Sequence, residues 1–303
     1  MSTEPSDWKG WEIYAGRRGL TARLLSFLND SLLVLRFAAN QAGKDHGIGR
    51  LAKLKLARRI IRNGRRVRSL TSWQAHLVLV EEILRVPKSV KGDVVECGCF
   101  NGATTISLSL ACALTNRRLF VCDSFEGLPL PKPGEENDIN ADSARELLYY
   151  HWEEGEFTSE GGLDGVKRNV ERLGNISVCR FVKGYFENTL KGIDTDSIVL
   201  VFEDADLVSS VRDCLLYLWP KLQEGCKFFS HEPASVTVVS LFYDIGWWKD
   251  NLGTLAPGFF GSGRGIVVAT ARPFVGYAEK FSAEKVLLQG KKIVHGGSRG
   301  YKS

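Results

Sequence analysis

The chain has 303 residues, of which 44% are hydrophobic and 25% are charged, values of an ordinary globular protein with a substantial core. This composition excludes an intrinsically disordered chain, a collagen and a small disulfide scaffold. The formal net charge of +5 is unevenly spread, because residues 1–68 contain fifteen Lys and Arg against five Asp and Glu. We therefore expect a basic N-terminal segment, carrying +10, before a mildly acidic body that carries −5.

The cysteines and the apolar segments bear on the compartment. The seven cysteines are an odd number without a C-x-x-C pair, and most lie in apolar runs, where a thiol behaves as a small hydrophobe. The first ten residues are polar, unlike a signal peptide. Charged residues interrupt the apolar run 20–39, so no uncharged stretch reaches the roughly 18–20 residues that span a bilayer. We expect a cytoplasmic protein in a reducing compartment.

Residues 1–70 are expected to form a basic helical extension. Within it, residues 44–68 hold ten Lys and Arg and one acid, and their leucines and isoleucines recur at near-helical spacing. Two interpretations stay open: a solvated helix face whose apolar side packs on the body, or a helix that lies on an anionic surface, either membrane lipid or a phosphorylated substrate. Few aromatic residues interleave with these charges, so we expect no nucleic-acid partner.

From residue 71 onward, helical patterns alternate with short apolar strands. The expected helices lie at 72–86, 102–115, 163–173, 209–222 and 235–246. The expected strands lie at 93–97, 119–122, 177–183, 197–202, 226–229 and 265–270. This alternation predicts an α/β fold with a Rossmann-like, doubly wound, mostly parallel sheet.

The body is expected to be one domain over residues 71–290, followed by a flexible tail at 291–303. A polar insertion at 129–162 interrupts the alternation of strands and helices. Residues 141–150 within it are compatible with a helix. We expect this insertion to cover the functional site as a lid.

Polar residues follow the first two strands, where an open parallel sheet binds its ligands. The first strand runs into E-C-G-C-F-N-G, in which Glu96 precedes Gly98, and Gly102 opens the next helix. The spacing matches neither a G-x-G-x-x-G fingerprint nor a P-loop, and a carboxylate there repels phosphate and suits an amino or hydroxyl group. The second strand ends at Asp123, where an acid is the usual partner of a ribose diol. Together these acids favour a zwitterionic nucleoside over a pyrophosphate.

The segments 92–102, 122–129, 182–190 and 203–207 carry a resemblance to a known family. Their sequences are G-D-V-V-E-C-G-C-F-N-G, C-D-S-F-E-G-L-P, V-K-G-Y-F-E-N-T-L and E-D-A-D-L. From about residue 91 to residue 273, the chain resembles the macrocin O-methyltransferase (TylF/MycF) family. The resemblance implies a class I methyltransferase fold and S-adenosyl-L-methionine as methyl donor.

The resemblance also implies roles for individual residues around the methyl donor. Glu96 and Gly98 would flank its methionine part, with Asn101 and Gly102 beside them. Asp123 would bind the ribose hydroxyls. The residues expected near the adenine are Ser124, Phe125, Gly184 and Tyr185.

A metal site is implied at the ends of the later strands. The family pattern D-G-D, whose first acid is a magnesium ligand, falls on Asp204, and an adjacent pair of family acids falls on His231 and Glu232. One imidazole among these three residues shifts the preference from Mg²⁺ toward Mn²⁺ or Fe²⁺. Two alternatives stay open: His231 is a metal-free general base, or the site no longer binds metal. His151 in the insertion is a second candidate base.

These features predict an S-adenosylmethionine-dependent O-methyltransferase that acts on a hydroxyl of a sugar or another small secondary metabolite, assisted by Mg²⁺ or Mn²⁺ if the metal site is retained. The alternatives are a methyltransferase of a lipid-linked or surface glycan, and a catalytically inactive methyltransferase-like binding module. The identity of the acceptor and the oligomeric state, a homo-oligomer included, stay open.

Overall fold

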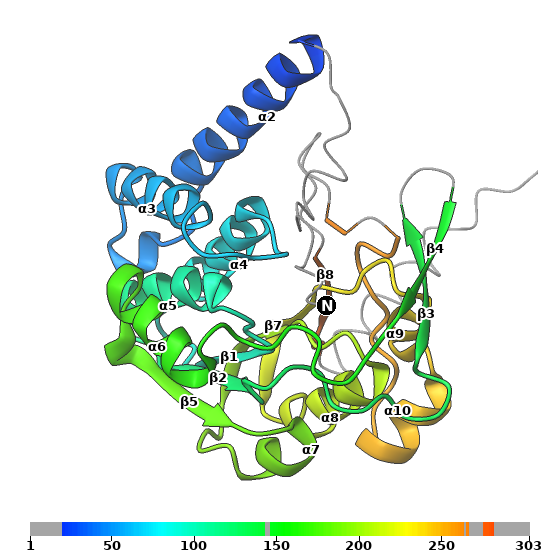
Figure 1. The fold of residues 1–303 in the computed structure, drawn as a ribbon. Helices are drawn as coiled ribbons and strands as arrows, with labels where there is room; N and C mark the ends of the chain where they lie inside the picture. Colours follow the sequence, from blue (N-terminus) through cyan, green and yellow to red (C-terminus); the bar gives the residue numbers. More distant parts are fainter. Residues whose placement is uncertain (1–19, 143–145, 264, 267–274, 282–303) are drawn as a thin grey trace, which may run out of the picture.

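A computed structural model describes residues 20–142, 146–263, 265–266 and 275–281. Its centre is a six-stranded sheet in the order β5-β2-β1-β6-β7-β8 (Figure 1). The strands are β1 (Asp93–Cys97), β2 (Leu119–Asp123), β5 (Cys179–Lys183), β6 (Ile198–Glu203), β7 (Leu222–Ser230) and β8 (Gly276–Glu279). All neighbours pair in parallel except β7 and β8. The doubly wound, mostly parallel α/β fold expected from the sequence is confirmed.

The strand order reverses between β1 and β6. From β1 the chain proceeds to β2 and β5 on one side, whereas β6 and β7 lie on the other side. Residues of β1, β2 and β6 are buried throughout, because helices cover both faces of the sheet. The loops that follow β1 and β6 diverge at this reversal, which is where sheets of this kind bind ligands.

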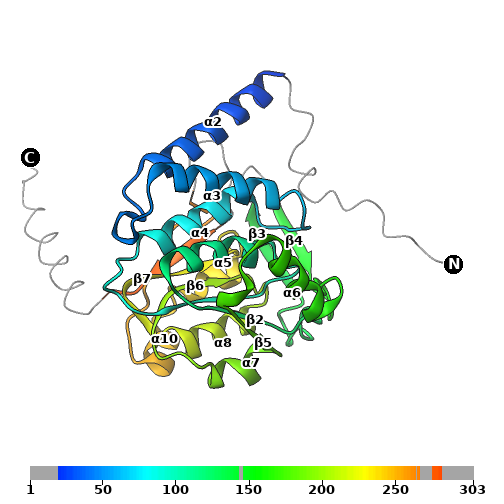
Figure 2. The same ribbon diagram turned by 90° about the vertical axis from the view of Figure 1, so that its left-hand side faces the viewer.

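Helices form a layer on each face of the sheet. Figure 2 shows α3, α4 and α5 on one side of the sheet and α7, α8 and α10 on the other. The helices are α2 (Leu20–Ala39), α3 (Arg50–Asn63), α4 (Trp73–Arg85), α5 (Ala103–Thr115), α6 (Gly162–Leu173), α7 (Phe186–Thr189), α8 (Val208–Leu218), α9 (Val236–Leu241) and α10 (Ile245–Leu252). Short 3-10 turns occur at η1 (Lys44–His46), η2 (Ile176–Val178) and η3 (Leu190–Gly192).

The insertion differs from its expected structure. The prediction of a helix at 141–150 is wrong, because β3 (Asn137–Asp142) and β4 (Glu146–His151) pair as an antiparallel hairpin. The segment E-L-L-Y-Y-H combines aromatic residues that favour strands, and a short apolar run does not by itself distinguish a strand from a helix.

Two further elements depart from the prediction. The helix expected at 235–246 is two helices, because Ser235 caps α9 and Asp244 caps α10, each side chain accepting a hydrogen bond from a backbone N–H. The strand expected at 265–270 is not found at 265–266, and residues 267–270 lie outside the described residues. The last described strand is β8.

The N-terminal helices share their buried core with the sheet. Leu33 and Phe37 of α2 and Leu56 and Ile60 of α3 belong to the same buried cluster as the strands. Among the helices that the structure describes, none combines the length and apolarity needed to cross a bilayer. The boundary at residue 70 stays a prediction, and the tail 291–303 lies outside the described residues.

Candidate active site

The loops after β1 and β6 are pressed together at the reversal of the sheet. The backbone N–H of Asp204 donates to the carbonyl of Cys97 at 2.8 Å. Gly98 has a φ of 84°, and a Cβ at this position would overlap the carbonyl oxygen of Asp204. Only glycine satisfies both demands, so Gly98 holds the turn after β1 directly beside Asp204.

Gly102 and Asn101 hold the rest of this loop in place. Gly102 has a φ of 81° at the N-cap of α5, and a Cβ there would lie 2.9 Å from a methyl of Val166 in α6. The Asn101 side chain accepts from the backbone N–H of Glu160 at 2.7 Å. Both residues therefore anchor the loop after β1 to the segment around α6, and their contact with a cofactor stays a prediction.

Glu96 is enclosed one residue before the end of β1. Its side chain is 0% exposed, and neither carboxyl oxygen has a hydrogen-bond partner among the described residues. Burial raises the pKa of Glu96 well above its usual value, opposed by the nearby Thr105 hydroxyl and reinforced by Asp123 and Asp204. The sequence led us to expect Glu96 at an open strand end, and the structure differs. A buried carboxyl without a partner is unfavourable, so these oxygens would accept a donor that entered beside them.

Asp123 is the last residue of β2 and braces two loops with its two oxygens. Oδ2 accepts from the backbone N–H of Cys99 and Oδ1 from that of Phe125, both at 2.6 Å. Burial raises the pKa of Asp123, while these backbone donors oppose the shift. Each carboxylate oxygen keeps a further lone pair, so Asp123 can still accept a hydroxyl proton.

Ser124 and Phe125 form the turn that follows Asp123. The Ser124 hydroxyl donates to the carbonyl of Gly127 at 2.7 Å. Phe125 is 2% exposed and lies 6.5 Å from the Phe181 ring, centroid to centroid. Both side chains thus serve the turn and the core here, and their expected place near an adenine stays a prediction.

Gly184 and Tyr185 lie beside the same turn, although they are about sixty positions later in the sequence. The backbone N–H of Gly184 donates to the carbonyl of Asp123 at 2.9 Å. Tyr185 follows at the N-cap of α7, partly buried, and burial raises the pKa of its phenol. The pairing of β2 with β5 brings these two expected cofactor residues to Asp123.

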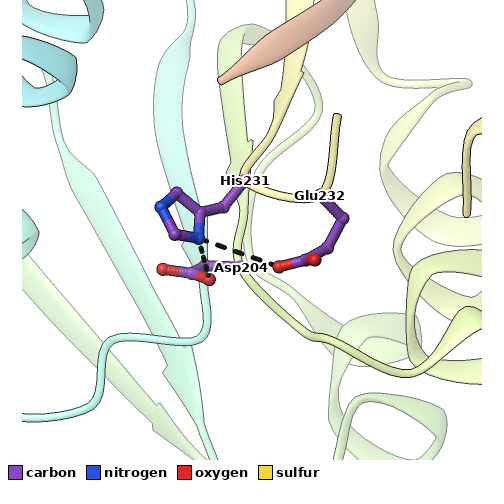
Figure 3. A group of neighbouring side chains, drawn as sticks. All are labelled: Asp204, His231 and Glu232. Carbon is purple, nitrogen blue, oxygen red and sulfur yellow. Dashed lines mark ion pairs between the residues drawn. The ribbon is translucent and has the colours of Figure 1, made fainter. Parts of the chain in front are cut away.

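Asp204, His231 and Glu232 form one cluster at the ends of β6 and β7. Because Glu203 pairs with Ser230 across the two strands, the residues that follow emerge side by side. Nδ1 of His231 lies 3.1 Å from Oδ1 of Asp204 and 3.7 Å from Oε1 of Glu232. Figure 3 shows both carboxylates directed at this one nitrogen.

The imidazole and the carboxylates influence one another's ionisation. Burial alone would lower the pKa of His231, but Asp204 and Glu232 outweigh it and hold that pKa well above its usual value. Burial raises the pKa of Glu232, and His231 opposes the shift. Nε2 of His231 is buried without a partner among the described residues. The two carboxylates therefore surround a positive charge, either the protonated imidazole of His231 or a cation that replaces its proton.

The donor atoms of this cluster fit a divalent cation. One ligand atom from each of the three residues lies within 4.8 Å of the others. Two carboxylates with one imidazole suit Mn²⁺ or Fe²⁺ better than Mg²⁺, which prefers oxygen ligands. A cation would also displace the proton from Nδ1, because a metal binds neutral imidazole.

The linker before α4 contributes contacts that sequence reasoning missed. The Thr71 hydroxyl donates to Oδ2 of Asp204 at 3.2 Å. Three residues earlier, Arg68 lies over the Phe100 ring at 5.7 Å and pairs with Glu160 at 3.8 Å. No local pattern marks Thr71, since it precedes a helix cap in the sequence and meets Asp204 only through the fold.

The buried His76 and the partly buried Asp206, both near the cluster, also escaped the sequence analysis. His76 in α4 exchanges hydrogen bonds of 3.1 Å with the Thr104 and Ser107 hydroxyls, and burial, helped by His231, lowers its pKa to about 3. Asp206 adopts a φ of 57°, and burial together with Glu232 raises its pKa well above the usual value. The D-x-D spacing at 204–206 was the one available signal for Asp206.

At the base of the hairpin, Asp138 influences the cluster, whereas the neighbouring His151 does not contact it. The exposed His151 has Nδ1 3.0 Å from Oδ1 of Asn137, and within the described chain it makes no hydrogen bond or ion pair with the cluster. The buried Asp138 instead accepts from Thr237 at 2.8 Å and contributes to the raised pKa of Glu232. His151 as a base stays a prediction without geometric support.

The sequence is similar to those of known O-methyltransferases. The chain is 33% identical over 140 residues to an 8-demethyl-8-(2,3-dimethoxy-alpha-L-rhamnosyl)-tetracenomycin-C 4'-O-methyltransferase of Streptomyces olivaceus, covering 45% of this chain and 51% of the relative. It is 28% identical over 153 residues to a demethyldecarbamoylnovobiocin O-methyltransferase of Streptomyces niveus, covering 48% and 53%. The chain thus spans about half the length of the curated relatives it matches.

Solved structures are similar at lower identity. The O-methyltransferase NovP aligns with a TM-score of 0.48 and 18% identity over 85% of this chain and 100% of that chain. The calicheamicin methyltransferase CalS11 aligns with a TM-score of 0.47 and 13% identity over 92% of this chain and 98% of that chain. The model of the macrocin-O-methyltransferase (TylF) family matches residues 72–229, just over half of the chain, from the cap of α4 to the end of β7. The chain belongs to the macrocin O-methyltransferase family.

Proposed function

We propose that this chain transfers a methyl group from S-adenosylmethionine to a hydroxyl of a sugar or another small secondary metabolite. The observation that carries the proposal is the arrangement at the carboxyl edge of the sheet. Glu96 and Asp123 lie at one side of the strand reversal, and the cluster of Asp204, His231 and Glu232 lies at the other. Family membership and the similarity to two Streptomyces O-methyltransferases support a hydroxyl as acceptor.

The cofactor would occupy the side of β1 and β2. Asp123 would accept hydrogen bonds from the two ribose hydroxyls, for which its backbone-bound oxygens have capacity left. The enclosed carboxyl of Glu96 would accept a proton donor from the methionine part, which would relieve its missing hydrogen bonds. Gly98, Asn101 and Gly102 would shape this wall, with the adenine toward Tyr185.

The chemistry needs alignment and removal of one proton. When bound, S-adenosylmethionine supplies an electrophilic methyl on a sulfonium. Asp204 and Glu232 would orient the acceptor hydroxyl, directly or through a divalent cation that they hold with His231. The acceptor proton would pass to a carboxylate of the cluster or, in the metal-free alternative, to His231 after its imidazole has become neutral.

The hairpin β3–β4, within the insertion 129–162, would act as the lid. Its base already contacts α9 through Asp138 and Thr237 and influences Glu232. Closure over the cluster would exclude water from the methyl donor. His151 pairs with Asn137 at the base of the hairpin, so it could reach the acceptor only if the base moved together with the lid.

The test is calorimetry with S-adenosylhomocysteine followed by turnover on glycosides with free sugar hydroxyls. We expect the chain to bind S-adenosylhomocysteine and Asp123→Ala to bind it more weakly. We also expect S-adenosylhomocysteine to be released from S-adenosylmethionine when an acceptor is present. A properly folded chain that binds neither S-adenosylmethionine nor S-adenosylhomocysteine would overturn the proposal. Binding without turnover on any hydroxylated acceptor would favour the inactive module instead.

A further inference from the structure

Exposed apolar side chains gather on the N-terminal helices. Half of the large apolar side chains that are exposed in the described chain, seven of fourteen, lie between residues 27 and 70. These seven are Phe27 (68% exposed), Leu28 (48%), Leu32 (56%), Leu35 (58%), Leu51 (75%), Leu54 (37%) and Leu70 (43%). Scattered exposed leucines are ordinary, so what matters is whether these side chains share a face of each helix and which charges lie beside them.

Helix α2 is apolar on two faces. Leu33 and Phe37 are buried against the body, whereas Leu28, Leu32 and Leu35 form an exposed row at helical spacing. Figure 1 and Figure 2 both show α2 projecting from the rest of the molecule. The exposed row therefore faces away from the core that the other side of the helix joins.

Helix α3 places leucines and cations together on its outer face. Leu51, Lys55, Arg58 and Arg62 follow one another at i, i+4, i+7 and i+11, with Leu54 beside them, and all are exposed. Lys55, Arg58 and Arg62 make no ion pair within the part of the chain that the structure describes. The charges are thus available, and they surround apolar side chains.

We propose that this surface docks on an anionic lipid membrane. The α2–α3 surface is defined by the exposed residues Leu28, Leu32, Leu35, Leu51, Leu54, Lys55, Arg58 and Arg62. Leucines that enter the boundary of the acyl chains, beside cations that remain at the phosphate level, are the two contributions that hold an interfacial helix. This docking concerns where the chain is held, so it stands independently of the proposed methyl transfer.

The charge of the surface argues against two other occupants. A second copy of the chain would bring the same unpaired cations together, and like charges across an interface are unfavourable. A nucleic acid would meet the cations but would leave Leu51 and Leu54 exposed to its phosphates. An anionic membrane accommodates both kinds of side chain at once.

The test is co-sedimentation of the full chain with vesicles. We expect binding to vesicles that contain phosphatidylglycerol, little binding to pure phosphatidylcholine, and a loss of binding as salt rises. Arg58→Glu with Arg62→Glu should weaken binding by at least about tenfold, since each such cation contributes about fivefold. The matched control reverses Lys191 and Lys249, two exposed lysines elsewhere, and should leave binding unchanged.

A second pair of variants tests the apolar contribution. Leu51→Ser with Leu54→Ser should also weaken binding by at least about tenfold, because two leucines would no longer enter the lipid. Both side chains are exposed, so circular dichroism should show an unchanged fold. Equal binding to neutral vesicles, or an equal loss in the lysine control, would overturn the proposal. So would a lipid-free dimer that the leucine variants dissociate, or RNA binding in place of vesicle binding.

Discussion

The two groups of acids at the carboxyl edge of the sheet are held in opposite ways. On the side of β1 and β2, Asp123 is bound by backbone N–H groups, and Glu96 is enclosed with no hydrogen-bond partner in the part of the chain that the structure describes. On the side of β6 and β7, Asp204 and Glu232 share the imidazole of His231. The first group is positioned by the backbone of loops. The second is positioned by the imidazole of His231, whose Nδ1 proton a cation could replace.

The two sides should differ in how they respond to protonation and to metal. Loops that hold Asp123 keep their shape whatever ion is present, which suits a rigid cofactor wall. The three side chains of the cluster are coupled by charge, so their arrangement responds to protonation and to metal. We therefore expect changes on the first side to affect binding and changes on the second side to affect turnover.

The largest effect is expected for Asp204→Ala. Removing this carboxylate takes away a ligand or an acceptor contact, so turnover should fall by at least about a hundredfold while S-adenosylhomocysteine affinity is kept. Activity assays and calorimetry measure the two quantities. Asp196→Ala, at an exposed acid elsewhere, serves as the control. Normal turnover in Asp204→Ala would remove the distinction between the two sides.

Chelation should show whether the cluster of Asp204, His231 and Glu232 uses a cation. If Asp204, His231 and Glu232 hold a cation, EDTA should reduce turnover to less than about a tenth, and Mn²⁺ should restore it better than Mg²⁺. Initial rates after dialysis and readdition measure this. Activity that does not respond to the chelator would favour His231 as a metal-free base.

Asp123→Ala should weaken S-adenosylhomocysteine binding by about 1–3 kcal/mol, because the ribose hydroxyls would lose their acceptors. Calorimetry measures the affinity, and Asp123→Asn, which retains one acceptor oxygen, should lose less. Since Asp123 also binds the N–H groups of Cys99 and Phe125, a thermal melt must accompany each variant. Unchanged affinity in a folded Asp123→Ala would contradict the ribose role.

His76 should make the fold sensitive to acid. Its pKa is lowered to about 3 in the folded chain and returns to about 6.5 on unfolding, so the unfolded chain binds the proton more tightly between these values. Stability should therefore fall as the pH drops from about 6.5, by about 2 kcal/mol at pH 5 from this group. Urea midpoints at pH 7 and pH 5 measure the loss, and His76→Gln should reduce it. An identical loss in the variant would assign the acid sensitivity to other groups.

The smallest effect is expected for Thr71→Val. This variant keeps the shape of the side chain and removes the hydroxyl that donates to Asp204. The activation free energy should therefore rise by about 1 kcal/mol, which lowers turnover roughly fivefold. Thr71→Ser retains the donor and should restore the rate. Equal rates in the Val and Ser variants would show that the contact does not orient Asp204.

Local patterns were sufficient for the five strands that pair in parallel, and for the positions of their polar ends. The prediction of a strand at 93–97 matches β1, and the expected acids at 123 and 204 do end β2 and follow β6. Apolar runs bounded by glycine depend only on neighbouring residues, so the strands that they predict can be found without the tertiary structure. The same signals were insufficient for the hairpin β3–β4, because short apolar runs are compatible with either kind of element.

The sequence by itself determined the alternation of helices with the five parallel strands, the family, and which polar residues lie near strand ends. Only the tertiary structure decided that Glu96 is enclosed, that Thr71 meets Asp204 from 133 residues away, and that leucines on α2 and α3 stay exposed, those on α3 beside exposed cations. The reason is physical. A strand or helix is specified by its neighbours in sequence, whereas burial and side-chain contact depend on which elements the sheet brings together.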